Sequence, residues 1–313
     1  LPQIAPHLVS RFYQERNGLY TRSTIDRGIQ THIESLAERW SNEFNRSDIR
    51  NLAILVIDIP TNQVVAYCGN VHFDRKQGGN QVDVIQAPRS TGSILKPFLY
   101  NAMLQEGSLL PKMLLPDVPV NINGFTPQNF SMQFEGAVPA SEALARSLNI
   151  PAVTMLQRYG VPKFHHLLQQ MGFKTINRAA SHYGLSLILG GAEATLWDVT
   201  NAYAQMVRSL SSNSPSPNVS QGKEAQILLE TENTEQINND TKQTSRNHKS
   251  NHNKQEKREQ SNSSPISVEE DSEETTSANA GAAWLTLSAL TEVNRPEEID
   301  WKSIPSMQTI AWK

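Results

Sequence analysis

The stretch from Ser211 to Asn279 constrains the fold more than any other feature of this 313-residue chain, because it contains no Phe, Tyr or Trp. Ser, Asn, Gln, Thr, Glu and Lys dominate it, so it cannot bury enough apolar surface to offset the entropy lost on ordering. We therefore predict a disordered polar insertion over residues 211–279. The globular sequence is then divided into two parts, 1–210 and 280–313.

Charge and cysteine content exclude several classes of protein. The net charge of -3 and the pI near 6.3 give no reason to expect nucleic-acid binding. The single cysteine, Cys68, excludes an intrachain disulfide, and we interpret it as a buried packing residue.

No run approaches the roughly 18–20 apolar residues that span a membrane. The N-terminus lacks the basic and apolar regions of a signal peptide and starts without Met, so we interpret the chain as part of a longer protein.

Hydrophobic spacing outside the insertion indicates a mixture of helices and strands. An apolar stripe predicts an amphipathic helix from about Tyr20 to Phe44, and the runs Leu52–Ile59 and Gln63–Tyr67 predict a hairpin. Four further helical patterns follow, at Ile94–Gln105, Ser141–Tyr159, Val161–Met171 and Leu196–Leu210. The chain ends in a strand-like run, Thr309–Lys313.

A hydroxyl and an amine three residues apart, Ser93 and Lys96, indicate acyl-transfer chemistry. Residues at this spacing lie on one face of a helix, within hydrogen-bonding reach. A serine needs a base to become a nucleophile, and a lysine in a partly apolar site can act as that base. Gly92 allows close approach of the chain, and the free N–H groups at a helix start favour an anionic intermediate. Pro97 predicts that the helix bends just after Lys96.

A second candidate motif, S-x-N, follows at Ser147-Leu148-Asn149. Alone, this pattern is typical of a helix end or a turn. Beside an activated serine it has a chemical use, because a second hydroxyl can relay a proton to a leaving amine. The amide of Asn149 can hold the backbone of a peptide substrate.

S-x-x-K together with S-x-N is the motif pair of penicillin-binding proteins and class A β-lactamases. The chain resembles the transpeptidase domain of class A penicillin-binding proteins, most closely the 1C type, over nearly everything outside the insertion. The matching stretches are Val64–Tyr67 with Gly69-Asn70, Arg89–Phe98, Pro127–Asn129, Ala143–Val153, Ala282–Leu285, Leu290–Pro296 and Ile310–Lys313.

The resemblance implies an α+β fold, with a five-stranded antiparallel sheet between helices and a mainly helical region that carries S-x-N. It implies that Ser93 is acylated by the penultimate D-alanine carbonyl of a peptidoglycan stem peptide, with Lys96 as base. Ser147 would shuttle the proton and Asn149 would bind the peptide, after which an amine of a neighbouring stem completes the cross-link. β-Lactams, as mimics of D-Ala-D-Ala, would acylate the same serine. The resemblance implies no metal and no cofactor.

The third motif of the family is K-T-G, and Lys313 falls where its lysine stands. The strand that follows would supply one N–H of the oxyanion hole, and losing one such donor costs roughly 100- to 1000-fold in rate. Because Lys313 falls at this motif, we expect residues 280–313 to return to the transpeptidase domain. Because the donor strand is missing, we expect the chain to be an inactive or weakly active fragment. The resemblance further implies an upstream glycosyltransferase domain and membrane anchor, at the periplasmic face of the inner membrane.

Three related proteins and a purely structural role are alternatives to this prediction. The structural role would be identified if no acyl-enzyme forms. A class A β-lactamase would have a deacylating glutamate where this chain has Ala145, which argues against that class. A D,D-carboxypeptidase has the same three motifs, and only its product distinguishes it. A non-catalytic β-lactam-sensing receptor domain also remains open, and very slow deacylation would identify it.

Overall fold

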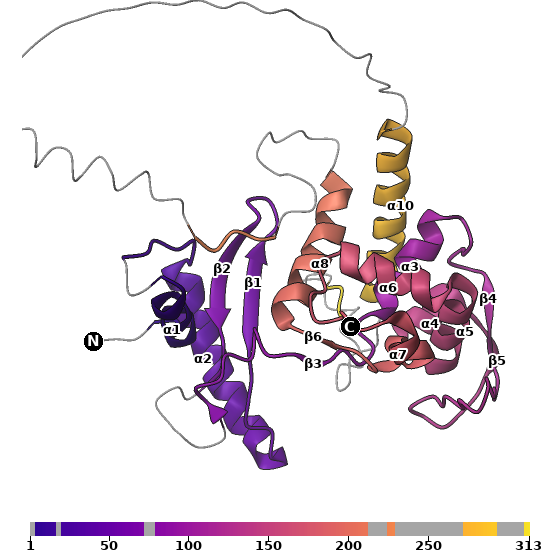
Figure 1. The fold of residues 1–313 in the computed structure, drawn as a ribbon, viewed down its shortest axis with the longest axis horizontal. Coiled ribbons are helices and arrows are strands. Elements are labelled where there is room, and N and C mark those ends of the chain that lie inside the picture. The colour runs from indigo at the N-terminus through magenta and orange to yellow at the C-terminus, as the bar shows by residue number, and fades with distance from the viewer. Residues whose placement is uncertain (1–3, 17–19, 72–78, 212–223, 229–271, 293–309) are drawn as a thin grey trace, which may run out of the picture.

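The computed structural model describes the chain except for residues 1–3, 17–19, 72–78, 212–223, 229–271 and 293–309. Figure 1 shows a smaller part on the left, where two helices lie beside a hairpin, and a larger, mostly helical part on the right. The predicted α+β class is confirmed. The smaller part contains α1 (Pro6–Glu15), α2 (Arg27–Phe44), the short helix η1 (Asn45–Ser47), β1 (Ile54–Asp58) and β2 (Gln63–Cys68).

The larger part begins after residue 88, and α10 belongs to it although α10 comes late in the sequence (Figure 1). Its elements are β3 (Arg89–Ser90), α3 (Lys96–Gln105), β4 (Leu114–Asp117), β5 (Gly136–Pro139), α4 (Ala140–Ala145), α5 (Asn149–Tyr159), α6 (Val161–Gln170), α7 (Ala180–Tyr183), η3 (Gly184–Leu189), β6 (Glu193–Ala194), α8 (Leu196–Arg208), η4 (Ser209–Ser211) and α10 (Ser272–Thr291).

The predicted hairpin is confirmed as β1 and β2, which pair antiparallel from Ile54 opposite Cys68 to Asp58 opposite Gln63. The helix predicted from about Tyr20 begins later, at Arg27, because the side chain of Asp26 caps it by accepting from the Ile29 N–H at 2.8 Å. The buried amide of Gln30 joins α2 to β2. It accepts from the Tyr67 N–H at 2.7 Å and donates to the Tyr67 carbonyl at 3.0 Å.

Residues 224–228 differ from the prediction of a polar insertion over 211–279, because they pair with the hairpin. The Val64 N–H donates to the Gln226 carbonyl at 2.8 Å, and Ala225 and Ile227 are buried. Helix α10 begins at Ser272, which also lies inside the predicted insertion. Composition averaged over the whole stretch hid a five-residue segment, Glu-Ala-Gln-Ile-Leu, that carries enough apolar surface to be buried. Most of the predicted insertion lies outside the described residues.

Helix α3 lies at the centre of the larger part, and its side chains are buried on nearly all sides. Its Phe98 packs against Phe173 and Tyr203, at centroid distances of 5.7 and 4.6 Å. Helix α10 packs alongside, and the buried Thr286 hydroxyl approaches the Asn101 side chain. The N-terminus of α3 is thereby held within the buried core.

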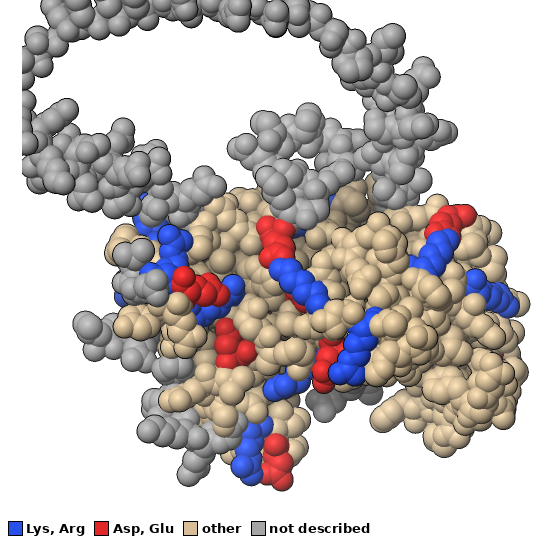
Figure 2. All heavy atoms as spheres, in the orientation of Figure 1, with Lys and Arg blue, Asp and Glu red and all other residues tan. Residues whose placement is uncertain are grey.

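Strand pairing in the described residues falls into three antiparallel pairs, β1–β2, β3–β6 and β4–β5. The five-stranded sheet that the resemblance implies is therefore represented by one hairpin, extended by bridges to Gln226 and, through Leu228, to Ser23. In the described part of the chain, no helix combines the length and apolar character needed to cross a bilayer. On the face drawn in Figure 2, acidic and basic side chains lie next to one another and do not gather into a patch of one sign.

Candidate active site

The turn before α3 places Ser93 and Lys96 at the edge of the core. Gly92 has φ +50°, and the Ile94 N–H donates to the Thr91 carbonyl at 3.0 Å. The Lys96 N–H donates to the Ser93 carbonyl at 3.1 Å, and α3 begins at Lys96 itself. Ser93 therefore lies in a turn, and the prediction that Ser93 and Lys96 share one helical face is wrong in this detail. Pro97 is the reason, because proline fits the first helical turn, where no carbonyl partner is needed.

A pair of short strands supports this turn from the other side. The Thr91 N–H donates to the Ala192 carbonyl at 3.0 Å, as an extension of the β3–β6 pairing. Gly190 has φ +97°, and a Cβ there would lie 2.9 Å from Gly92 Cα and 2.7 Å from the Ser90 hydroxyl. Only glycine fits this close approach. Gly190 is thus required for the position of the Gly92–Ser93 turn.

Lys96 is the electrostatic centre of the site. It is 1 % exposed, and its Nζ donates to the Asn149 Oδ1 at 2.7 Å and to the Ser147 carbonyl and hydroxyl at 2.8 and 3.3 Å. Burial, and to a lesser extent the charge of Lys313, lower the pKa of Lys96 from 10.5 to about 7. An amine with this pKa is available as a base near neutral pH.

Ser147 lies in a break between two helices, where one continuous helix from Ser141 to Tyr159 was predicted. Helix α4 ends at Ala145 and α5 begins at Asn149. The Ser147 N–H donates to the Leu144 carbonyl and the Leu148 N–H to the Ala143 carbonyl, at 3.0 and 2.9 Å. These bonds, with φ +58° at Ser147, form a Schellman turn that has serine where glycine is usual. Hydrophobic periodicity continues through the break and therefore does not reveal it.

The left-handed conformation of Ser147 gives a stability prediction. Both Ser147→Gly and Ser147→Ala remove the hydroxyl, but only glycine relieves a conformation that costs an L-residue roughly 1–2 kcal/mol. Part of this gain is offset, because glycine adds entropy to the unfolded chain. We expect the glycine variant to be more stable than the alanine variant by about 1 kcal/mol in urea unfolding. Equal stabilities would contradict the strained turn.

Asn149 and Lys313 complete the cluster. The Asn149 Nδ2 donates to the Gln128 carbonyl at 2.8 Å, which turns its Oδ1 toward Lys96. The Lys313 Nζ donates to the Leu144 carbonyl at 2.7 Å, so the end of the chain lies beside the turn that carries Ser147. Burial lowers the pKa of Lys313 to about 8.

The structure thus brings together four of the five predicted site residues through direct contacts or charge, namely Lys96, Ser147, Asn149 and Lys313. Ser93 is half-buried and lies next to this cluster, because the turn that contains it ends at Lys96. The described hydrogen bonds of the Lys96 side chain go to Ser147 and Asn149, and not to the Ser93 hydroxyl. Nowhere in the described ranges do His, Cys, Asp and Glu side chains gather into a group that could hold a metal ion.

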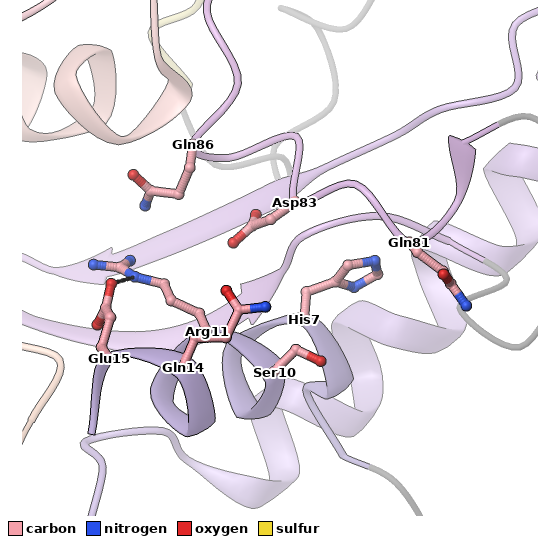
Figure 3. A pocket seen from close by; sticks show the side chains of 8 residues that line it. All are labelled: His7, Ser10, Arg11, Gln14, Glu15, Gln81, Asp83 and Gln86. Carbon is pink, nitrogen blue, oxygen red and sulfur yellow. Dashed lines mark hydrogen bonds and ion pairs between the residues drawn. The ribbon is translucent and has the colours of Figure 1, made fainter. Parts of the chain in front are cut away.

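A polar hollow of about 420 Å³ lies apart from this cluster, between α1 and the segment from Gln81 to Gln86 (Figure 3). Arg11 lies on one side of it and is paired with Glu15. Asp83 lies on the opposite side and accepts a hydrogen bond from the buried Tyr67 hydroxyl. None of the five predicted site residues lines this hollow.

Sequence comparison finds a match to the family described as penicillin binding protein transpeptidase domain over residues 52–282. The chain is 36% identical to penicillin-binding protein 1C of Escherichia coli K12 over 208 residues, which is 66% of this chain and 27% of that protein. It is 29% identical to penicillin-binding protein 1A of Neisseria cinerea over 189 residues, which is 58% of this chain and 23% of that protein. The chain therefore spans about a quarter of the length of these curated relatives.

Structural comparison shows a likeness in fold to a solved penicillin-binding protein. Penicillin binding protein 3 of Mycobacterium tuberculosis, in its apo form, matches with a TM-score of 0.51 at 19% identity, over 60% of this chain and 47% of that one. The PonA1 protein of the same organism in complex with penicillin V matches with a TM-score of 0.49 at 20% identity, over 66% of this chain and 60% of that one.

Proposed function

Because the chain belongs to the family of penicillin-binding protein transpeptidase domains, we propose that it carries the acyl-transfer site of a peptidoglycan D,D-transpeptidase. The observation that supports this most strongly is the buried Lys96 amine, bonded to Ser147 and Asn149 and with its pKa lowered to about 7. In the parent protein we propose the same setting as the resemblance implies, with a membrane anchor and a glycosyltransferase domain, at the periplasmic face of the inner membrane.

In the proposed first step, the neutral Lys96 amine takes the proton of the Ser93 hydroxyl as Ser93 Oγ attacks the penultimate D-alanine carbonyl. The tetrahedral intermediate then breaks its C–N bond, and the leaving amine takes a proton through the Ser147 hydroxyl. Free D-alanine departs and an ester on Ser93 remains. Ser147 is suited to this relay, since its hydroxyl lies 3.3 Å from Lys96 Nζ.

In the proposed second step, the amine of a neighbouring stem peptide attacks the ester. Its proton passes to Lys96, the ester C–O bond breaks, and Ser93 regains its proton. Asn149 would hold the donor peptide by its amide, and the Lys313 ammonium would bind the carboxylate of the donor or of a β-lactam. A β-lactam would acylate Ser93 through the first step alone.

The pH dependence of acylation tests this proposal. Lys96 acts as base only when neutral, so the rate should rise with pH up to about 7. Lys313 binds a carboxylate only when charged, so the rate should fall again above about 8. We expect a narrow bell between these limits when labelling by a fluorescent penicillin is timed from pH 5 to 9. The labelling should be slow, as expected of a weakly active fragment. Absence of labelling at every pH would overturn the proposal that this chain is itself acylated, and a flat profile would remove Lys96 from the role of base.

A product assay tests the transfer half of the reaction. A stem peptide ending in D-Ala-D-Ala is incubated with the chain and an amine acceptor. The proposal expects release of D-alanine together with a new amide on the acceptor. Release of D-alanine with only the hydrolysed peptide as second product would assign the chain to the D,D-carboxypeptidases.

A further inference from the structure

The side chain of Asn129 lies in the wall of the site and makes a complete set of hydrogen bonds. It is 2 % exposed. Its Nδ2 donates to the Asp117 Oδ1 at 2.7 Å and to the Gln133 carbonyl at 3.0 Å. Its Oδ1 accepts from the Asn149 N–H at 2.9 Å and from the Ile150 N–H at 3.4 Å. Both donors and both acceptor positions of the amide are used, which fixes its orientation.

The two hydrogen bonds that Asn129 accepts from the Asn149 and Ile150 N–H groups have a specific role at the start of α5. The N-cap residue of α5 is Leu148, which offers no side-chain acceptor. The first N–H groups of a helix lack partners within the helix and are usually satisfied by a Ser, Thr, Asp or Asn at that position. Asn129, 20 residues earlier in the chain, supplies the missing acceptor.

The residue held by this cap is also the residue that contacts Lys96. Asn149 is the first residue of α5, and its Oδ1 lies 2.7 Å from Lys96 Nζ. The Gln128 carbonyl, next to Asn129, accepts from the Asn149 Nδ2 at 2.8 Å. Neighbouring residues of one loop thus fix both the backbone and the side chain of Asn149.

Asp117 anchors Asn129 in turn. This carboxylate is 1 % exposed at the end of β4. One oxygen accepts from Asn129, and the other accepts from the Glu135 N–H at 3.0 Å. The position of Asn149 therefore depends on a buried chain of hydrogen bonds that begins in the β4–β5 hairpin.

We propose that Asn129 is a positioning residue, which, held by Asp117, fixes the start of α5 so that the Asn149 amide meets Lys96. This inference rests on the proposed function, because its consequence is the rate of Ser93 acylation. Misplacing a catalytic group by about 1 Å can cost about 100-fold in rate. We expect Asn129→Ala to slow acylation by a fluorescent penicillin about 100-fold per folded molecule.

A charge exchange separates positioning from general stability. Asn129→Asp alone places a second carboxylate at the 2.7 Å contact with the Asp117 carboxylate, and the two repel each other. This variant should slow acylation as much as Asn129→Ala. Adding Asp117→Asn reverses the donor and the acceptor of this contact. In this double variant the new carboxylate at position 129 can still accept from α5, and the new amide at position 117 can still accept from the Glu135 N–H. The Gln133 carbonyl, however, loses the donor that Asn129 Nδ2 supplies. The double variant should therefore recover part of the rate that Asn129→Asp loses.

Asn201→Ala is the matched control, since Asn201 is also a buried amide that accepts a backbone N–H, that of Ala225 at 2.6 Å, but in α8. Its acylation rate per folded molecule should stay within about threefold of the unaltered chain. Equal slowing of both alanine variants, or no recovery in the double variant, would overturn the positioning role.

Amide hydrogen exchange gives a readout that does not depend on catalysis. Asn149 and Ile150 should exchange faster in Asn129→Ala and regain protection in the double variant. If the unaltered chain takes up no penicillin, the proposed function fails, and the positioning role in catalysis fails with it. Hydrogen exchange at the Asn149 and Ile150 amides still decides in that case whether Asn129 caps α5. If the unaltered chain is labelled and Asn129→Ala is labelled equally fast, only the positioning role fails.

Discussion

Replacing Ser93 by alanine should leave the chain folded and unlabelled by a fluorescent penicillin. Removing the nucleophile of a serine acyl-transfer enzyme costs about a million-fold in rate, which is below detection on a denaturing gel. The side chain of Ser93 makes no described hydrogen bond on which the fold depends, and the turn is held by the backbone bonds of Thr91 and Lys96. The thermal unfolding midpoint should therefore change little.

Ser108→Ala is the control for this experiment. Ser108 follows the C-terminus of α3 and its hydroxyl donates to the Met103 carbonyl, at the end of the helix away from Lys96. Its labelling should equal that of the unaltered chain. Labelling that persists in Ser93→Ala would identify another nucleophile. Peptide mapping would then test Ser147 first, because its hydroxyl contacts Lys96 directly.

Replacing Lys96 by methionine should slow acylation by about 100- to 10,000-fold, the range that a positioned general base contributes. Methionine keeps an unbranched apolar side chain in the buried site, but it offers no base in place of the Lys96 amine. The second-order rate constant of labelling, measured over a time course, checks this. The bell-shaped pH dependence should lose its rising side in the variant, because that side reports the titration of Lys96.

Lys163→Met provides the matched comparison, since Lys163 is an exposed lysine that pairs with Glu106 on the far end of α3. It should leave the rate unchanged. A Lys96→Met variant that is acylated within about threefold of the unaltered chain would show that another group removes the Ser93 proton.

Local sequence patterns predicted the parts of the molecule that local forces determine. Alternating and continuous apolar runs predicted the β1–β2 hairpin, and helical spacing predicted α6 and α8 to within a few residues. The motif residues Lys96, Ser147 and Asn149 were also predicted, and the structure brings them within hydrogen-bonding distance. Their catalytic roles remain a proposal.

The features that were missed depend on contacts between distant segments. In the sequence, Asn129 belongs only to a stretch that resembles the family, because nothing near it shows that it caps a helix 20 residues later. The break at Ser147 was missed because a left-handed turn is usually marked by glycine. Asp117 and Gly190 carry no local signal for their roles either, since their partners lie on other elements.

The late pairing of residues 224–228 has a consequence for biosynthesis. The Asn62 side chain donates to the Glu224 carbonyl, 162 residues further along the chain. At about 5–20 residues per second, the ribosome needs on the order of ten to thirty seconds to make that interval. Throughout this time the β2 edge at Val64 lacks the strand that later accepts its N–H. An unpaired edge is a template for association with other chains, so the nascent protein passes through a period in which this edge needs protection.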